Sequence, residues 1–199
     1  MGVLMEGMQR SSPIQRGGNK ILTEAVSFDY FLSEALAPAD KFDDPTFIAQ
    51  DALYRRWRGF APPGTCTLVP LEGTSCEKNK YGCKYIALCP TMRVPQSVKW
   101  DREVVYECMW SLLVEIDNHN QAARSAISTG QPSAPLIKSV VMPGLATGVG
   151  GVSVNKCAKQ MALAIKQYDE AVSDSKVWSR LDWETIFTSQ NELVETHNL

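Results

Sequence analysis

The sequence contains little histidine, no long apolar run and no cluster of one charge, and each absence excludes a class of function. Only His119 and His197 are present, and neither lies near a residue that it would activate as a nucleophile. The 20 basic and 22 acidic residues are interspersed, whereas nucleic-acid binding needs a basic face. No apolar run approaches the length of a membrane span. We therefore expect neither a nucleic-acid partner nor a membrane partner.

The start of the chain also lacks a recognisable targeting signal. Residues 1–18 have neither the charged start nor the apolar core of a secretory signal, so we expect an intracellular protein, cytoplasmic or nuclear. Residues 1–20 are rich in Gly, Ser and Gln without periodicity, which predicts a loose leader. We expect one α/β domain over residues 21–175, and a C-terminal tail over residues 176–199 that docks as a short helix or coil.

The six cysteines do not follow a zinc or disulfide pattern. Four lie in apolar strand-like or helical runs, where free Cys behaves as a small hydrophobe, namely Cys66, Cys89, Cys108 and Cys157. Cys76 and Cys83 flank a polar loop and are the candidate pair for a disulfide. No second pair or nearby His completes a zinc set. We expect structural thiols, no metal and no cofactor.

Apolar periodicity predicts strands that alternate with helices. We expect helices over residues 21–36, 45–58, 101–123 and 153–172, strands over 65–71, 84–89 and 136–142, and a polar linker over 125–135. This alternation is typical of helices packed around a sheet. Ligands of such sheets bind at the carboxyl ends of the strands. We therefore expect the loops at residues 90–95 and 143–151 to lie together and form one pocket mouth.

Two of the predicted helices carry an apolar side. In the helix over 101–123, the apolar stripe predicts core packing and consists of Val104, Val105, Cys108, Met109, Leu112, Leu113 and Ile116. In the helix over 153–172, one side consists of Ala158, Met161, Ala162, Ile165 and Tyr168. In the tail, we expect the docking side chains to be Trp178, Leu181, Trp183, Ile186 and Phe187.

The most informative segment is the glycine-rich loop, residues 143–153 (PGLATGVGGVS). A β-branched run leads into it and a helix follows it. Glycines let backbone N–H groups approach an anion closely, and the helix start adds its own free N–H groups and partial positive charge. The loop therefore predicts a phosphate or diphosphate cradle. The alternative is a plain glycine-rich connection, and the segment lacks the Gly-Lys-Ser/Thr of a P-loop.

Four segments of the chain resemble macro domain-like proteins of the fungal type. They are residues 57–66 (WRGFAPPGTC), 89–95 (CPTMRVP), 143–151 (PGLATGVGG) and 158–164 (AKQMALA). The resemblance covers residues 28–168. It implies a three-layer α/β/α sandwich with a mixed sheet that binds ADP-ribose or a related metabolite. Some members of the family hydrolyse ADP-ribose esters, O-acetyl-ADP-ribose or ADP-ribose-1″-phosphate.

The same resemblance implies where the ligand binds. The glycine-rich loop would wrap the diphosphate and distal ribose, and the turn at residues 90–92 would shape the same cleft. The implied ligand-binding residues are Gly144, Leu145, Ala146, Thr147, Gly148, Val149, Gly150 and Gly151, together with Pro90, Thr91 and Met92.

The chain also departs from the family pattern. Macro domains begin with strands and an Asn-bearing loop, whereas here Asn19 follows Gly17 and Gly18 instead of preceding them. Gly150 stands where many members place an aromatic residue over the distal ribose. These departures imply an N-terminally truncated or divergent member with its early strands partly missing. Hydrolysis of ADP-ribose derivatives and a non-catalytic remnant that acts through protein contacts both stay open as alternatives to binding alone.

Overall fold

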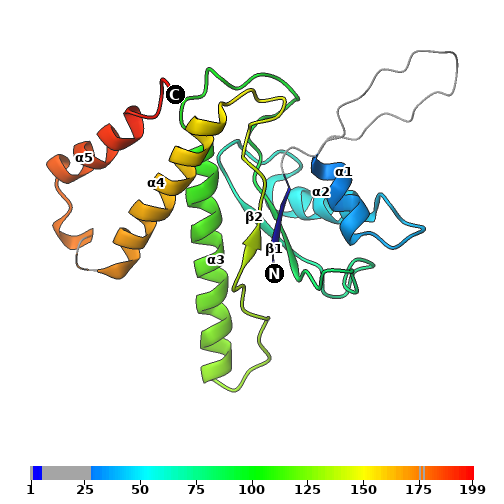
Figure 1. Ribbon diagram of the computed structural model, residues 1–199. Helices are drawn as coiled ribbons and strands as arrows, with labels where there is room; N and C mark the ends of the chain where they lie inside the picture. Colours follow the sequence, from blue (N-terminus) through cyan, green and yellow to red (C-terminus); the bar gives the residue numbers. More distant parts are fainter. Residues whose placement is uncertain (1, 6–27, 175, 177) are drawn as a thin grey trace, which may run out of the picture.

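The computed structural model describes residues 2–5, 28–174, 176 and 178–199, and these form three layers around a sheet (Figure 1). Helices α1 (Phe28–Leu36) and α2 (Asp44–Trp57) lie on one face of the sheet. Helices α3 (Val104–Ser128) and α4 (Val154–Ser173) lie on the other face. A 3₁₀ turn at Trp178–Arg180 precedes α5 (Trp183–Val194), which packs outside α4. The predicted α/β/α sandwich is confirmed.

The sheet is mixed, as predicted. Its strands are β1 (Gly2–Met5), β2 (Thr67–Pro70), β3 (Tyr85–Leu88) and β4 (Val140–Val141), in the order β2-β3-β1-β4. Strand β1 runs parallel to both of its neighbours, with Met5 opposite Leu88 on β3 and Val3 opposite Val141 on β4. Strand β2 runs antiparallel to β3. The carboxyl ends of β1, β3 and β4 therefore meet at one edge of the sheet.

The prediction of a loose leader over residues 1–20 is wrong at residues 2–5. These residues form β1, which is hydrogen-bonded on both sides, so an early strand of the sheet is present. A strand of four residues is too short for a periodic signal, and its conformation depends on partners that lie far along the chain. The rest of the predicted leader, with Gly17, Gly18 and Asn19, and the predicted helical residues 21–27 lie outside the described residues.

The sheet separates two apolar cores, and β3 contributes to both. Ala87, and Cys89 just after the strand, face α3, whereas Ile86 and Leu88 face α1 and α2. This alternation explains why the segment reads as a nearly continuous apolar run. All six cysteines are buried, none forms a disulfide, and they are divided between these two cores, which agrees with their interpretation as small hydrophobic residues.

Helix α3 confirms the predicted apolar stripe and extends it. Val104, Cys108 and Leu112 are buried against the sheet. The helix ends at Ser128 instead of Ala123, so the first residues of the predicted linker are helical. Asn120 joins α3 to the segment before β4, because its side chain donates to Ile137 O at 2.9 Å and accepts from Ile137 N at 2.8 Å.

The predicted apolar side of α4 is only partly correct: Met161 packs against the core and Tyr168 against Trp110, but the fully buried residues of this helix are largely polar. Its buried residues are Lys156, Cys157, Gln160, Ala164 and Gln167, whereas Ile165 is 48% exposed. Gln160 Nε2 donates to Arg102 O at 2.6 Å and to Thr196 Oγ1 at 2.9 Å. Hydrophobic periodicity cannot identify a side that is buried through hydrogen bonds.

The tail does form a helix, but it docks through other residues than those predicted. Leu193 is buried, and Glu192 accepts from Lys166 Nζ at 2.7 Å and from Gln167 Nε2 at 2.9 Å. Trp183 and Phe187 are instead 73% and 61% exposed. Among the helices of the described residues, none has the length and apolar character needed to cross a membrane.

Candidate ligand-binding site

The two loops singled out from the sequence lie at the same edge of the sheet. The turn at residues 90–92 follows β3, the glycine-rich loop follows β4, and both strands run parallel to β1 between them. Figure 1 shows both loops at the upper end of the sheet. Val98 N, in the segment after the turn, donates to Gly150 O at 2.9 Å and joins the two loops directly. The predicted proximity of the two loops is confirmed, whereas the single pocket mouth that they are expected to form stays a prediction.

The glycine-rich loop is closed by its own hydrogen bonds. Ala146 adopts a left-handed conformation with φ of 57°, and its carbonyl accepts from Val152 N at 3.0 Å. Gly151 has φ of 69° and donates to Gly148 O at 3.0 Å. Thr147 Oγ1 donates to Gly144 O at 2.9 Å. These bonds give the loop a defined shape before α4 begins.

The predicted site residues divide into buried and exposed groups. Leu145, Ala146 and Thr91 are buried, so their side chains do not face solvent, and Gly150 is buried as well. Pro90, Met92, Thr147 and Gly151 are half-buried. Gly144, Gly148 and Val149 are exposed, and Val149 has 65% of its surface accessible. The part of the loop open to a ligand is therefore centred on Gly148 and Val149.

Two glycines of the loop serve different purposes. A Cβ placed on Gly150 would lie 2.6 Å from Ala146 O and 3.1 Å from Val98 Cγ2, so the loop's own packing requires glycine there. The aromatic residue that the family pattern places at this position has no room. A Cβ placed on Gly148 would meet no atom within 4 Å. Packing within the loop therefore accounts for Gly150, whereas Gly148 is free of such contacts among the described residues.

The exposed part of the loop presents backbone donors next to a helix start. Within the described residues, the N–H groups of Gly148, Val149 and Gly150 make no hydrogen bond to the protein. Ser153 caps α4, because its Oγ accepts from Lys156 N at 3.0 Å. The cap pairs only one of the free N–H groups at the helix start. Free amides and a helix N-terminus together favour an anion.

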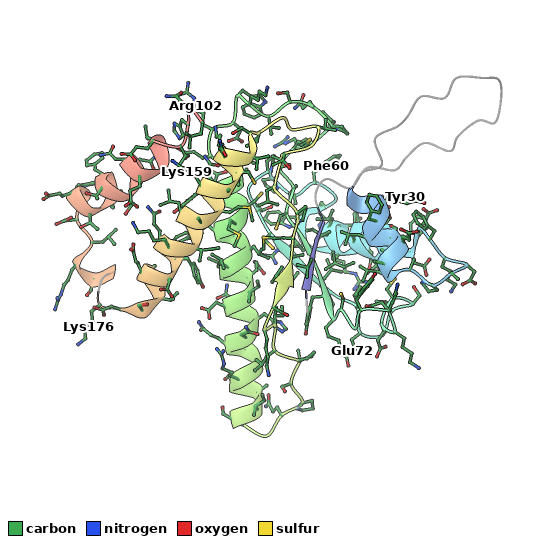
Figure 2. All side chains as sticks on the ribbon, viewed as in Figure 1. Tyr30, Phe60, Glu72, Arg102, Lys159 and Lys176 are labelled. Atoms are coloured by element: carbon green, nitrogen blue, oxygen red, sulfur yellow. The ribbon has the colours of Figure 1, made fainter. Side chains whose placement is uncertain are left out.

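A basic side chain that the sequence analysis did not single out lies against the glycine-rich loop. A Cβ placed on Gly151 would lie 3.0 Å from Lys99 Cε, so the side chain of Lys99 lies against the loop. Figure 2 shows Arg102 and Lys159 at the end of the molecule where α4 begins. Lys99 comes directly after Val98, and only the Val98–Gly150 hydrogen bond brings it to the loop.

The C-terminal segment is hydrogen-bonded to the first turn of α4. Lys156 is buried and its Nζ donates to His197 O at 3.3 Å. Burial, followed by the charge of Arg102, lowers the pKa of Lys156. His197 Nε2 lies 2.8 Å from Glu103 Oε1, just before α3. The helix start that follows the loop is thus anchored to both α3 and the tail.

Two surface hollows lie away from the glycine-rich loop. One, of about 100 Å³, lies at the other end of the sheet and includes Leu71, Cys83 and Tyr85. The other, of about 330 Å³, lies between the turn at residues 62–65 and the start of α3. In the part of the chain that the structure describes, no group of three or more His, Cys, Asp or Glu side chains is placed to hold a metal ion.

Comparisons with known proteins complete this description. No family model and no curated protein matches the chain. Among solved structures, an Oceanobacillus iheyensis macrodomain mutant with ADPR aligns at 16% identity and a TM-score of 0.47, over 71% of this chain and 62% of that chain. A second mutant of the same macrodomain aligns at 16% identity and a TM-score of 0.48, over 83% of this chain and 66% of that chain. In both alignments, this chain covers less than two thirds of the length of the macrodomain chain.

Proposed function

We propose that this chain binds ADP-ribose or a related ADP-ribose metabolite, with the diphosphate held by the glycine-rich loop. One observation carries the proposal: the N–H groups of residues 148–150, two of them on the exposed residues Gly148 and Val149, have no protein partner within the described residues and lie just before the N-terminus of α4. Backbone amides and a helix start stabilise a phosphate without needing a basic surface. A chain with a net charge of −2 needs such a device to attract an anion.

The surroundings of the loop support a ligand larger than phosphate. The glycine-rich loop and the turn at residues 90–92 flank the carboxyl end of β1, so an elongated ligand would extend from one to the other. Half-buried Met92 adds an apolar surface on the far side, and Lys99 adds a positive charge beside the loop. The sequence resemblance to macro domain-like proteins favours ADP-ribose among such diphosphates.

The proposed role is binding without hydrolysis. Hydrolysis needs a positioned water and a group that orients it or accepts its proton. Residues 143–153 include no Asp, Glu, His or Cys, so the loop itself has no side chain for proton transfer. The buried hydroxyl of Thr91 is not exposed to solvent.

Titration calorimetry with ADP-ribose tests the proposal on the whole chain. We expect wild type to bind and Gly148→Glu to lose binding by about 100-fold or more, because its carboxylate would occupy the anion site. The variant should melt like wild type, since a Cβ at Gly148 meets open space. Lys99→Met should weaken binding by about threefold to tenfold, because it removes one charge and keeps the aliphatic stem.

Two control variants distinguish the effect of the added charge in Gly148→Glu from the effect of its position in the loop. Gly148→Ala should retain binding, and Ala122→Glu adds the same charge at an exposed position of α3. ADP-ribose and ADP should bind more tightly than AMP if the diphosphate is the recognised group. A cooperatively melting wild type that gives no heat with ADP-ribose would refute the proposal, as would Gly148→Glu binding at wild-type affinity.

A further inference from the structure

We infer that a second site, in the hollow between the turn at residues 62–65 and the start of α3, binds a guanidinium group. We call it the Glu107 hollow. It has a volume of about 330 Å³ and is lined by Pro63, Gly64, Thr65, Tyr106, Glu107, Trp110 and Ser111. The site is distinct from the glycine-rich loop and does not depend on the function proposed above.

The wall of the Glu107 hollow contains two aromatic rings and a carboxylate from one helix. Tyr106 and Trp110 lie one turn apart on α3, with ring centroids 6.0 Å apart and planes at 24°. The Tyr106 hydroxyl donates to Gln167 Oε1 at 2.7 Å, and Trp110 packs edge-on against Tyr168 at 5.5 Å. These contacts hold both rings in place before any ligand binds. A planar cation stacks favourably on such rings.

The carboxylate of Glu107 has no cationic partner. Within the described residues, no basic side chain lies within 4.0 Å of it. Burial raises the pKa of Glu107, and the nearby charges of Asp101 and Glu103 raise it further. A bound cation would relieve both effects, because it replaces lost hydration and offsets the neighbouring negative charge.

The Glu107 carboxylate lies against Gly64, where any side chain would displace it. Gly64 has φ of 83°, and a Cβ placed on it would lie 2.5 Å from Glu107 Oε2. The backbone of Gly64 is already paired, because its N–H donates to Pro90 O at 3.0 Å and its carbonyl accepts from Ser111 Oγ at 2.7 Å. The polar group that remains for a ligand is therefore the Glu107 side chain.

A second glutamate on α3, Glu115, does have a guanidinium partner and can be compared with Glu107. Glu115 lies two turns after Glu107 on the same face of α3. Arg56 donates to both of its carboxylate oxygens, at 2.6 Å and 3.2 Å, and the Arg56 guanidinium lies 5.5 Å from the ring centre of Trp57. Glu115, Arg56 and Trp57 thus combine a carboxylate, a guanidinium and an indole. The Glu107 hollow has a carboxylate and an indole but no guanidinium among its lining residues. Since an ammonium cannot fork onto a carboxylate, guanidinium is the cation that this arrangement favours.

Binding of capped arginine, N-acetyl-arginine amide, tests the inference on the whole chain by calorimetry or by NMR of the tryptophan indole N–H groups. We expect N-acetyl-citrulline amide, which has the same shape without the charge, to bind at least about tenfold more weakly. Glu107→Gln should weaken arginine binding about tenfold, and Trp110→Leu about threefold to fivefold. Glu34→Gln, an exposed change of equal charge on α1, should leave the affinity unchanged.

The outcomes separate this inference from the function proposed above. Gly148→Glu should bind capped arginine like wild type, and Glu107→Gln should bind ADP-ribose like wild type. Tighter binding of capped than of free arginine would indicate a polypeptide as the source of the guanidinium, and equal binding would indicate a small molecule. Absence of binding by folded wild type at about 10 mM would overturn the inference. Equal affinities for arginine and citrulline, or for wild type and Glu107→Gln, would also overturn it.

Discussion

The glycine-rich loop and the turn at residues 62–65 lie at the same edge of the sheet, but they expose opposite kinds of group. In the loop, Gly148 faces open space and the amides around it have no protein partner within the described residues. In the turn, both backbone polar groups of Gly64 are paired, and the neighbouring Glu107 side chain has no cation. The first arrangement suits an anion and the second suits a cation. A glycine therefore indicates a ligand site only through what surrounds it.

The largest effect on stability is expected from Gly150→Ala. The new Cβ would lie 2.6 Å from the backbone oxygen of Ala146, which cannot move without opening the loop. We expect a loss of about 2–3 kcal/mol in the free energy of unfolding, typical of overpacking. Thermal and urea denaturation measure it, with Gly148→Ala as the matched control that should stay within about 0.5 kcal/mol of wild type. Equal stabilities of the two variants would show that the loop packs differently.

A smaller effect is expected in the turn, from Gly64→Ala. Its positive φ costs about 1–2 kcal/mol for a residue with a Cβ. Gly73→Ala is a matched control, since Gly73 has φ of 72° and no atom within 4 Å of a new Cβ. Any excess loss in Gly64→Ala measures the crowding against Glu107, whose Oε2 can move aside but whose Cβ lies 3.0 Å from the new Cβ. Gly64→Ala should also weaken arginine binding, whereas Gly73→Ala should not.

Removal of the helix cap beside the loop should cost about 1 kcal/mol. Ser153→Ala deletes the acceptor for Lys156 N, and Asp182→Ala deletes the equivalent acceptor for Thr185 N at the start of α5. Both variants should lose similar stability in chemical denaturation. Only Ser153→Ala should weaken ADP-ribose binding, because it loosens the helix start next to the loop. Parallel losses of ligand affinity in both variants would contradict a specific role for α4.

The smallest effect is expected from the charge of Glu107. The folded protein raises the pKa of the Glu107 carboxyl. Ionisation of Glu107 therefore lowers the stability of the protein as the pH rises from the ordinary pKa of this group to its higher pKa in the folded state. Glu107→Gln should therefore be slightly more stable than wild type at neutral pH, by less than about 0.5 kcal/mol since solvent screens the group. The difference should disappear below the ordinary pKa. Denaturation midpoints measured from acid to neutral pH test this sign.

Much of the fold follows from local patterns. The apolar runs before the two loops predict β3 and, of the strand expected over residues 136–142, the two residues that form β4, and the three-to-four spacing from Val104 to Leu112 predicts α3. Parallel strands then place the turn at residues 90–92 and the glycine-rich loop together. These features depend on periodicity over a few residues and on the direction of neighbouring strands. Both can be inferred without coordinates.

Other features depend on contacts between distant residues and leave no local signal. Residues 2–5 become a central strand only because β3 and β4 pair with them. The buried side of α4 is defined by the hydrogen bonds of Gln160 to Arg102 and Thr196. Lys99 lies against the loop because Val98 is bonded to Gly150, and nothing in its own segment indicates this position.

By itself, the sequence determined that a glycine-rich loop joins a strand to a helix at the carboxyl edge of the sheet. Only the tertiary structure decided which glycine serves the loop's own packing and which leaves its amides open, since this depends on the positions of Ala146 O and Val98. The same holds for Glu107, which is one of many acidic residues in the sequence. Its position beside Trp110 in the Glu107 hollow, with no basic side chain of the described residues next to it, distinguishes it in the folded chain from Glu115, which is paired with Arg56. Backbone conformation follows from local chemistry, whereas exposure and pairing follow from how distant segments pack.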